Sequence, residues 1–343
     1  MNLIKTNVKE SYFKANVLEG KTWYKDYLLI LIIIAFVIIA SVINPKFLNI
    51  SNIFTILKYA SIMGFLALGM TIIMILGEID FSAAAISNFV AFFSVILIIN
   101  GINNMAFVLI ASILVGVVLS FLNSIFTVYI KAPLFIISVG MTILLRGITR
   151  TMARGGGLIH PGTLIPGFDI LGRCDFAGFF PVSVIALIAF GVLTMLIVEY
   201  SPLGRKMYAV GSNADVAKHV GIKVNKVRIY MFLIAGLLYG IAGVITSSTL
   251  GLFMVGFGDD YQLSALISVF LGMSFLSLKI PNIKGTLISV ILISTLINGF
   301  TMLNLPFYIK GVIEGLILVF AIGSLSFRKK REQDINIIEE IAK

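Results

Sequence analysis

The sequence predicts an all-α polytopic membrane protein with about ten transmembrane helices and both termini in the cytoplasm. This prediction rests on an apolar composition, ten apolar runs of membrane-spanning length, and an uneven distribution of Lys and Arg between those runs. Of the 343 residues, 59% are hydrophobic and 12% are charged, and the mean hydropathy is +1.06. Soluble domains carry about 25% charged residues. The net charge of +10 therefore indicates a membrane surface, and we expect no nucleic-acid partner.

Ten apolar runs have the length needed to cross a hydrocarbon core about 30 Å thick. The first run, 27–43, is too long for the apolar core of a signal peptide, and no small-residue cleavage site follows it. Turn-forming residues separate the runs, as at Asn44-Pro45 and Lys131-Ala132-Pro133. The predicted membrane helices are 27–43, 54–77, 82–99, 105–128, 133–150, 180–199, 229–248, 261–277, 285–303 and 308–326.

This pattern divides the chain into a cytoplasmic head at 1–26, a transmembrane domain at 27–326 and a basic cytoplasmic tail at 327–343. The longest loops within the domain are a cytoplasmic one at 200–228 and an extracellular one at 151–179. Membrane proteins concentrate Lys and Arg in their cytoplasmic segments. With both termini inside, 19 of the 26 Lys and Arg residues lie in the cytoplasmic segments 1–26, 78–81, 129–132, 200–228, 278–284 and 327–343.

Residue types that support catalysis, metal binding or ATP binding are scarce in this chain. Cys174 is the single cysteine, and the two histidines, His160 and His219, lie far apart in the sequence. We therefore expect no catalytic residues and no metal site. The sequence has no Gly-Lys-Ser/Thr phosphate-binding loop. We expect no cofactor in this chain, with ATP and Mg²⁺ bound by a partner ATPase.

The cytoplasmic loop at 200–228 is polar in a chain that is otherwise apolar. Its central part, 213–220, predicts two turns of helix, because Asn213 can cap the start and Gly221 can end it. A short capped helix between two membrane helices is suited to docking on another protein. A solvated loop with basic anchoring residues is the alternative interpretation.

The residues of this loop resemble a known segment. Tyr200 to Ile222 is similar to the cytoplasmic coupling segment of ABC importer permeases of the ribose/xylose/arabinose type, which reads T-x-x-G-R-x-x-x-A-x-G-x-N-x-x-A-A-x-x-x-G-I. Val216 replaces the first alanine of the family's pair. The resemblance implies that coupling to an ATPase involves Gly204, Arg205, Gly211, Asn213, Asp215, Ala217 and Gly221.

Further stretches extend the resemblance over nearly the whole chain. Residues 67–82 look like A-L-G-M-T-x-V-I-x-x-G-G-I-D-L-S-V-G-S, and 133–147 are similar to P-x-F-I-V-T-L-G-T-M…R-G. The chain departs from the family at Glu78, where a glycine is usual, and at 272–282, which lacks several glycines. At 261–264 it has Tyr-Gln-Leu-Ser in place of the family's Tyr-Glu-Leu-Asp. These departures imply an unusual substrate or a divergent partner in a heterodimer.

The resemblance also implies partners and a cargo. Such a permease domain lies in the plasma or inner membrane and pairs with a second permease chain, identical or different. It works with a cytoplasmic ATP-binding subunit and an extracellular solute-binding protein, and it is not itself an enzyme. The expected cargo is a monosaccharide such as ribose. The alternatives are a nucleoside or furanosyl signalling molecule and, more remotely, an ion-gradient-driven secondary transporter, which would need more buried ionisable residues.

Polar residues in or beside the predicted helices are candidates for a translocation pathway. Asp80 costs about 3 kcal/mol to insert, so it either serves a pathway or caps the following helix, and capping is the simpler interpretation. Glu314 follows Lys310 by four residues, a spacing that predicts an ion pair. The pathway candidates are Asp80, Ser82, Asn88, Ser138, Thr142 and Asn298.

Overall fold

The computed structural model describes residues 23–153, 157–162, 165–176, 180–274, 280–306 and 308–323. These residues are mostly helical, and 308–323 form the last described helix. The numbered α-helices are α2 (Trp23–Ile43), α3 (Ile50–Ile75), α4 (Ala83–Ile99), α5 (Met105–Tyr129), α6 (Leu134–Met152), α7 (Val182–Met195), α8 (Pro202–Ser212), α9 (Ala214–His219), α10 (Val224–Leu250), α11 (Asp260–Ser274) and α12 (Ile283–Met302).

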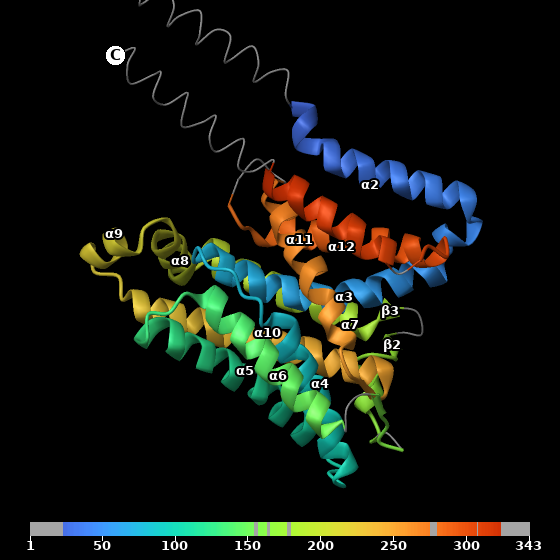
Figure 1. Cartoon of the computed structure of the whole chain (residues 1–343), viewed down its shortest axis with the longest axis horizontal. Coiled ribbons are helices and arrows are strands. Elements are labelled where there is room, and N and C mark those ends of the chain that lie inside the picture. Colours follow the sequence, from blue (N-terminus) through green and yellow to red (C-terminus); the bar gives the residue numbers. More distant parts are fainter. Residues whose placement is uncertain are drawn as a thin grey trace, which may run out of the picture.

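Strands are short and lie in the segments that connect the helices. β1 (Leu158–Ile159) pairs antiparallel with β4 (Phe253–Met254), and β2 (Asp175–Phe176) pairs antiparallel with β3 (Phe180–Pro181). Short helical turns complete the connections: η1 (Pro45–Leu48), η2 (Phe168–Ile170), the π-helical η3 (Leu196–Tyr200) and η4 (Phe257–Asp259). The described part of the chain is therefore a helical bundle, and two small strand pairs join loops between its helices (Figure 1).

Each of the ten predicted runs coincides with a described helical segment, which confirms the all-α polytopic class. Among the described residues, six helical segments are long and apolar enough to cross a membrane: Ile50–Ile75, Met105–Tyr129, Leu134–Met152, Val182–Tyr200, Val224–Leu250 and Ile283–Met302. The number of crossings and the side of the termini stay predictions. Residues 1–22 of the predicted head and the whole predicted tail, 327–343, lie outside the described residues.

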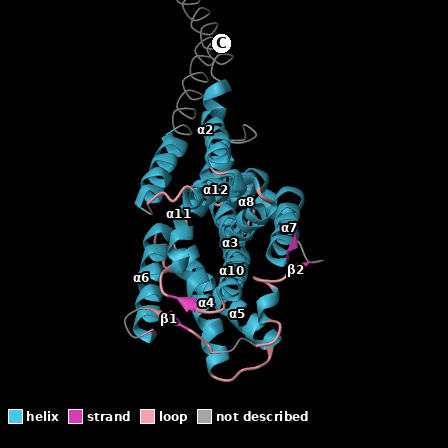
Figure 2. Ribbon diagram, turned by 90° about the vertical axis from the view of Figure 1, so that its right-hand side faces the viewer, coloured by secondary structure: helices cyan, strands magenta, loops and turns pink. Residues whose placement is uncertain are grey.

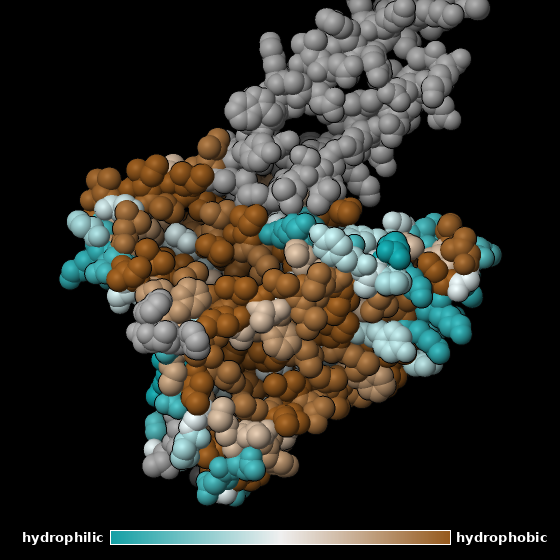
Figure 3. All heavy atoms as spheres, turned by 180° about the vertical axis from the view of Figure 1, so that it is seen from behind, coloured by the Kyte–Doolittle hydropathy of each residue, from teal (hydrophilic) through white to brown (hydrophobic). Residues whose placement is uncertain are grey.

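Helices α3 and α10 form the centre of the bundle, with α6 and α7 on opposite sides of them (Figure 2). In the most apolar stretch of α3, 83% of the residues are buried inside the protein, against 22% for α5 and 28% for α6. Helix α3 therefore contacts protein on nearly every side, whereas α5 and α6 present apolar side chains outward. Figure 3, seen from behind, shows a broad hydrophobic face with hydrophilic residues along its edges.

Contacts among loops and helix ends join parts of the chain that the sequence predicts on the same side of the membrane. The contacts at the predicted extracellular end are Lys58–Asp175 (3.0 Å), Arg146–Asp259 (3.0 Å) and the β1–β4 pair, and those at the predicted cytoplasmic end are Arg228–Glu78 (3.2 Å), Lys284–Glu199 (2.8 Å) and Tyr208 to the carbonyl of Pro281 (3.1 Å).

Helices α5 and α10 cross with their backbones in direct contact. A Cβ atom built on Gly236 of α10 would lie 2.8 Å from the carbonyl oxygen of Gly116 on α5, and one built on Gly116 would lie 2.9 Å from the carbonyl oxygen of Gly236. Small residues allow such approach in membranes, where helices associate by close packing. Glycine at these positions is therefore a requirement of the crossing.

We expect Gly236→Leu to destabilise the fold by about 1–3 kcal/mol, because the new side chain has no space at this crossing. The measurement is the thermal unfolding midpoint of the purified chain in a mild detergent. Gly147→Leu is the matched control, since Gly147 is exposed on α6 and a Cβ there meets no atom within 4 Å. Equal midpoints for the two variants would show that the crossing tolerates a side chain.

Candidate functional site

Helix α8 begins the polar segment predicted to be cytoplasmic, 200–228, and packs against the ends of two apolar helical segments. The Ser201 hydroxyl accepts hydrogen bonds from the backbone N–H groups of Leu203 (3.1 Å) and Gly204 (3.2 Å), which caps the helix. A Cβ on Gly204 would overlap the carbonyl oxygen of Val198. At the other end of α8, a Cβ on Gly211 would overlap the carbonyl oxygen of Ile75 on α3. Helix α8 is therefore in backbone contact with η3 and with the end of α3.

Helix α9 is the short capped helix that the sequence predicts. The side-chain oxygen of Asn213 accepts hydrogen bonds from the backbone N–H groups of Asp215 and Val216, both at 3.0 Å. Gly221 follows the helix with φ of +86°, a left-handed conformation that disfavours residues with a Cβ. Both the predicted cap and the predicted stop are confirmed.

The two faces of α9 differ in burial. Ala217 is buried against the rest of the protein, while Asp215 is exposed, as is Arg205 on α8. Val216 and Val220 are 57% and 72% exposed, and their spacing of four residues puts them on one face. Val220 was not identified from the sequence, although two apolar residues four apart in a polar segment indicate an apolar helix face. The exposed face of α9 is thus an apolar patch with charged residues beside it.

The chain turns between α3 and α4 around a buried carboxylate. One oxygen of Asp80 accepts hydrogen bonds from the backbone N–H (2.8 Å) and hydroxyl (2.6 Å) of Ser82, and the other accepts from the hydroxyl of Tyr239 on α10 (3.2 Å). The amide of Asn123 on α5 donates to the Ser82 hydroxyl (2.8 Å). Both oxygens of Asp80 are therefore occupied from inside the protein. The prediction that Asp80 caps α4 is wrong, because Ser82 holds the N-cap position without a side-chain hydrogen bond to the helix and the first-turn N–H of Ala84 donates to Gln262 of α11.

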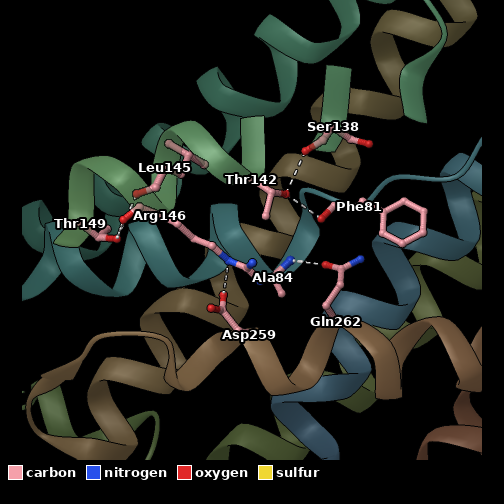
Figure 4. Close-up of polar contacts among 9 residues, drawn as sticks. All are labelled: Phe81, Ala84, Ser138, Thr142, Leu145, Arg146, Thr149, Asp259 and Gln262. Carbon is pink, nitrogen blue, oxygen red and sulfur yellow. Dashed lines mark hydrogen bonds and ion pairs between the residues drawn. The ribbon is translucent and has the colours of Figure 1, made fainter. Parts of the chain in front are cut away.

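Side chains of α6 and α11 also hydrogen-bond to this turn (Figure 4). The side chain of Gln262 donates to the carbonyl of Asp80 (3.1 Å) and accepts from the backbone N–H of Ala84 (2.9 Å). The Thr142 hydroxyl lies 2.9 Å from the carbonyl oxygens of Phe81 and Ser138. Gln262 stands where the resembled family has a glutamate, and its neutral amide both donates and accepts here.

An ion pair connects this turn to the end of the polar segment 200–228. Arg228, in the first turns of α10, contacts Glu78 at 3.2 Å. Burial raises the pKa of Glu78, and the Arg228 guanidinium opposes that rise. Beside this pair lies a cavity of about 860 Å³, which Lys131 and Lys218 also line. The turn, α9 and the start of α10 therefore lie together, at the end of the bundle that the sequence predicts to be cytoplasmic.

The remaining pathway candidates lie in different places. Asn88 is buried on α4, beside Gly258 of η4. Asn298, on α12, accepts a hydrogen bond from Asn52 (3.0 Å) and lines a second cavity toward the predicted extracellular end. The structure thus groups Asp80, Ser82, Ser138 and Thr142 around the α3–α4 turn and leaves Asn88 and Asn298 apart from them.

The ion pair expected between Glu314 and Lys310 is wrong. Lys310 pairs with Asp260 (3.5 Å), and Glu314 accepts a hydrogen bond from the Ser264 hydroxyl (2.6 Å). Asp260 and Ser264 are themselves four residues apart on α11, so each residue of the predicted pair meets a partner on the facing helix. In the part of the chain that the structure describes, no three His, Cys, Asp or Glu side chains gather as a metal site.

A bundle of long apolar helices, with a short capped helix in the polar segment between two of them, defines an integral membrane protein. Residues 52–322 match the family described as branched-chain amino acid transport system / permease component. The chain therefore belongs to this family of membrane permeases.

Curated relatives agree over most of the chain. It is 33% identical to the ribose import permease protein of Bacillus subtilis, covering 86% of this chain and 90% of that one. It is 28% identical to the ribose import permease protein of Escherichia coli K12, covering 88% and 94%. It is 26% identical to the xylose transport system permease protein of Haemophilus influenzae, covering 88% and 95%. No solved structure matches the chain.

We expect Asp80→Ala to lower the stability of the bundle by about 1–3 kcal/mol, because the substitution leaves buried donors on Ser82 and Tyr239 without their acceptor. Thermal unfolding in detergent measures the change. Asp215→Ala is the control, since Asp215 is exposed and should leave the midpoint in place. An unchanged midpoint for Asp80→Ala would contradict the structural role of this carboxylate.

Proposed function

We propose that this chain is the membrane permease subunit of an ATP-binding-cassette importer for a monosaccharide. The observation that supports this most is the capped helix α9, which presents exposed Val216 and Val220 outward while α8 lies in backbone contact with α3. A surface that is both apolar and mechanically connected to the bundle core suits a partner that delivers force. ATP and Mg²⁺ would be held by that partner, a cytoplasmic ATP-binding subunit.

Coupling would run through contacts at the cytoplasmic end. When the partner moves α9, the contact of Gly211 with Ile75 transmits the displacement to α3. The pair of Arg228 with Glu78 transmits it to the turn at Asp80. Packed elements shift as units between discrete arrangements, so a push at one end can retilt α3 and α10 together. The coupling residues are Gly204, Arg205, Gly211, Asn213, Asp215, Ala217 and Gly221.

The names of the relatives support a sugar cargo. Ribose and xylose appear in the names given above, and the chain is also 25% identical to the L-arabinose ABC transporter permease protein of Azospirillum brasilense. A nucleoside or furanosyl signalling molecule is the alternative within the same class. An ion-driven transporter would need free ionisable groups along a pathway. Asp80 and Glu314 are instead hydrogen-bonded inside the bundle, and Glu78 is paired.

For the topology, we propose ten crossings with both termini in the cytoplasm and the loop 151–179 outside. A second permease chain, identical or divergent, would complete the pore, and an extracellular solute-binding protein would deliver the cargo. The outward apolar faces of α5 and α6 suit lipid and a second membrane chain equally.

Replacing Asp215 with Lys, or Gly221 with Leu, should abolish solute uptake while leaving membrane insertion intact. The first change reverses a charge on the exposed face of α9. The second puts a side chain on residue 221, whose left-handed backbone conformation ends the helix and disfavours residues with a Cβ. Uptake of labelled ribose by cells that contain the whole importer measures the effect, and the amount of chain in the membrane fraction measures insertion.

Asp215→Glu is the matched control, since it keeps the charge and should keep most uptake. Co-purification of the ATP-binding subunit provides a second readout, which Asp215→Lys should reduce and Asp215→Glu should preserve. Normal uptake by both Asp215→Lys and Gly221→Leu would refute the coupling role of α9.

The single cysteine tests the proposed orientation. Cys174 lies in the loop 151–179 and is partly exposed, so a membrane-impermeant maleimide should label it in intact cells. In a Cys174→Ala background, Ser212→Cys at the exposed end of α8 should be labelled after permeabilisation and not before. The reverse pattern would invert the topology.

A further inference from the structure

A cavity of about 550 Å³ lies toward the predicted extracellular end of the bundle. Its walls come from the first half of α3, the start of α11, the last turns of α12 and the turn at 254–257. Small-molecule sites typically occupy about 300–1,000 Å³ and combine apolar walls with a few placed polar groups. The cavity is distinct from the cytoplasmic cavity beside Glu78 and shares no residue with it.

Several polar side chains line this cavity without an internal partner for every group. Ser294 and Asn298 are 4% and 9% exposed. In the part of the chain that the structure describes, the Ser294 hydroxyl and the Asn298 amide nitrogen make no hydrogen bond, while the Asn298 oxygen accepts one from Asn52. Buried polar groups are nearly always hydrogen-bonded in folded proteins. Ser294 and Asn298 are therefore available to donate to and accept from a bound solute, and the hydroxyls of Tyr59, which is 46% exposed, and of the partly buried Tyr261 also stand on the lining.

Aromatic rings stand beside these polar groups. Phe257 and Tyr261 meet edge to face, with ring centroids 5.8 Å apart, and Tyr59 contributes a third ring to the lining. Aromatic side chains offer a broad apolar face, and tyrosine adds a hydroxyl at its edge. Such a lining suits a ring-shaped solute with C–H groups on its faces and hydroxyls at its rim.

The charged groups of the cavity neutralise one another. Asp260 and Lys310 form an ion pair at 3.5 Å, and the Asp260 side chain is 77% exposed, which places the pair at the opening. Glu314 lies behind the wall and accepts the hydrogen bond of Ser264, so its role is to orient that hydroxyl. The lining therefore favours a neutral solute over an anion.

We infer that this cavity is the solute-contacting site of the permease and that it takes a neutral polyhydroxylated ring of pentose size. Asn298 and Ser294 hydrogen-bond the solute hydroxyls, and Phe257 and Tyr261 contact the face of the ring. The inference rests on the proposed function for its cargo class and adds to it a place and a recognition chemistry.

Protection from alkylation tests the site directly, because a Cys174→Ala background leaves a single introduced thiol. Thr301→Cys places that thiol in the cavity at an exposed position, and Ser51→Cys places it at an exposed position outside the lining. The full importer in intact cells is treated with a small membrane-impermeant thiol reagent and increasing D-ribose, D-xylose or L-leucine. At about ten times the dissociation constant, bound solute should slow labelling of the Thr301→Cys variant about tenfold.

The expected result is protection of the Thr301→Cys variant by a pentose, no protection of the Ser51→Cys variant, and loss of the protection when Asn298→Ala is added. Protection by L-leucine in place of the pentoses would overturn the assignment of a neutral ring. If the Thr301→Cys thiol is unprotected in cells that still import the pentose with ATP, the site is overturned and the proposed function stands. Protection without ATP-dependent import would uphold the site and refute the proposed function.

Discussion

The carboxylate of Asp80 is fully buried where the chain turns between α3 and α4, and a buried charge is tolerated when its oxygens are hydrogen-bonded. Ser82 and Tyr239 supply those hydrogen bonds, and Asn123 in turn holds Ser82. Since Tyr239 belongs to α10 and Asn123 to α5, satisfying one side chain fixes both helices against the α3–α4 turn. The close crossing of α5 and α10 and the enclosure of α3 are the packing that this constraint requires.

The same turn is where the polar segment 200–228 meets the core of the bundle. Helix α8 contacts the last residues of α3, and Arg228 reaches Glu78 only two residues before Asp80. A displacement of α9 would therefore reach the bundle at the hydrogen-bonded α3–α4 turn. The contacts of Gly211 with Ile75 and of Arg228 with Glu78 are direct, so no flexible loop separates α8 and α10 from this turn. Interfaces and packed cores respond to such displacements as units rather than by gradual deformation. The glycines at 204 and 211 matter because they allow this direct contact.

Local signals in the sequence predicted the features that depend on local physics. The ten apolar runs match helices, Asn213 caps α9, and Gly221 ends it, because hydropathy, capping and positive φ are properties of neighbouring residues. The hydrogen-bond partners of Asp80 and Gln262 lie up to 182 residues away in the sequence. These pairings depend on how the helices are aligned against one another, which the spacing of residues in the sequence does not reveal. The Glu314 prediction failed for this reason: the facing helix offered each residue a better partner.

Polar residues in the bundle differ in how far the protein itself uses their hydrogen-bonding groups, and composition alone does not show this difference. The side chains of Asp80, Ser82 and Thr142 hydrogen-bond to other groups of the protein, so few of their donors and acceptors are free to bind a solute. Ser294 and Asn298 retain unused groups that face a cavity. In an importer whose affinity resides in a separate binding protein, a few such groups suffice, because tight binding in the pore would slow release. Under this proposal, the path of the solute is marked by polar groups that both lack a protein partner and face the cavity, as those of Ser294 and Asn298 do.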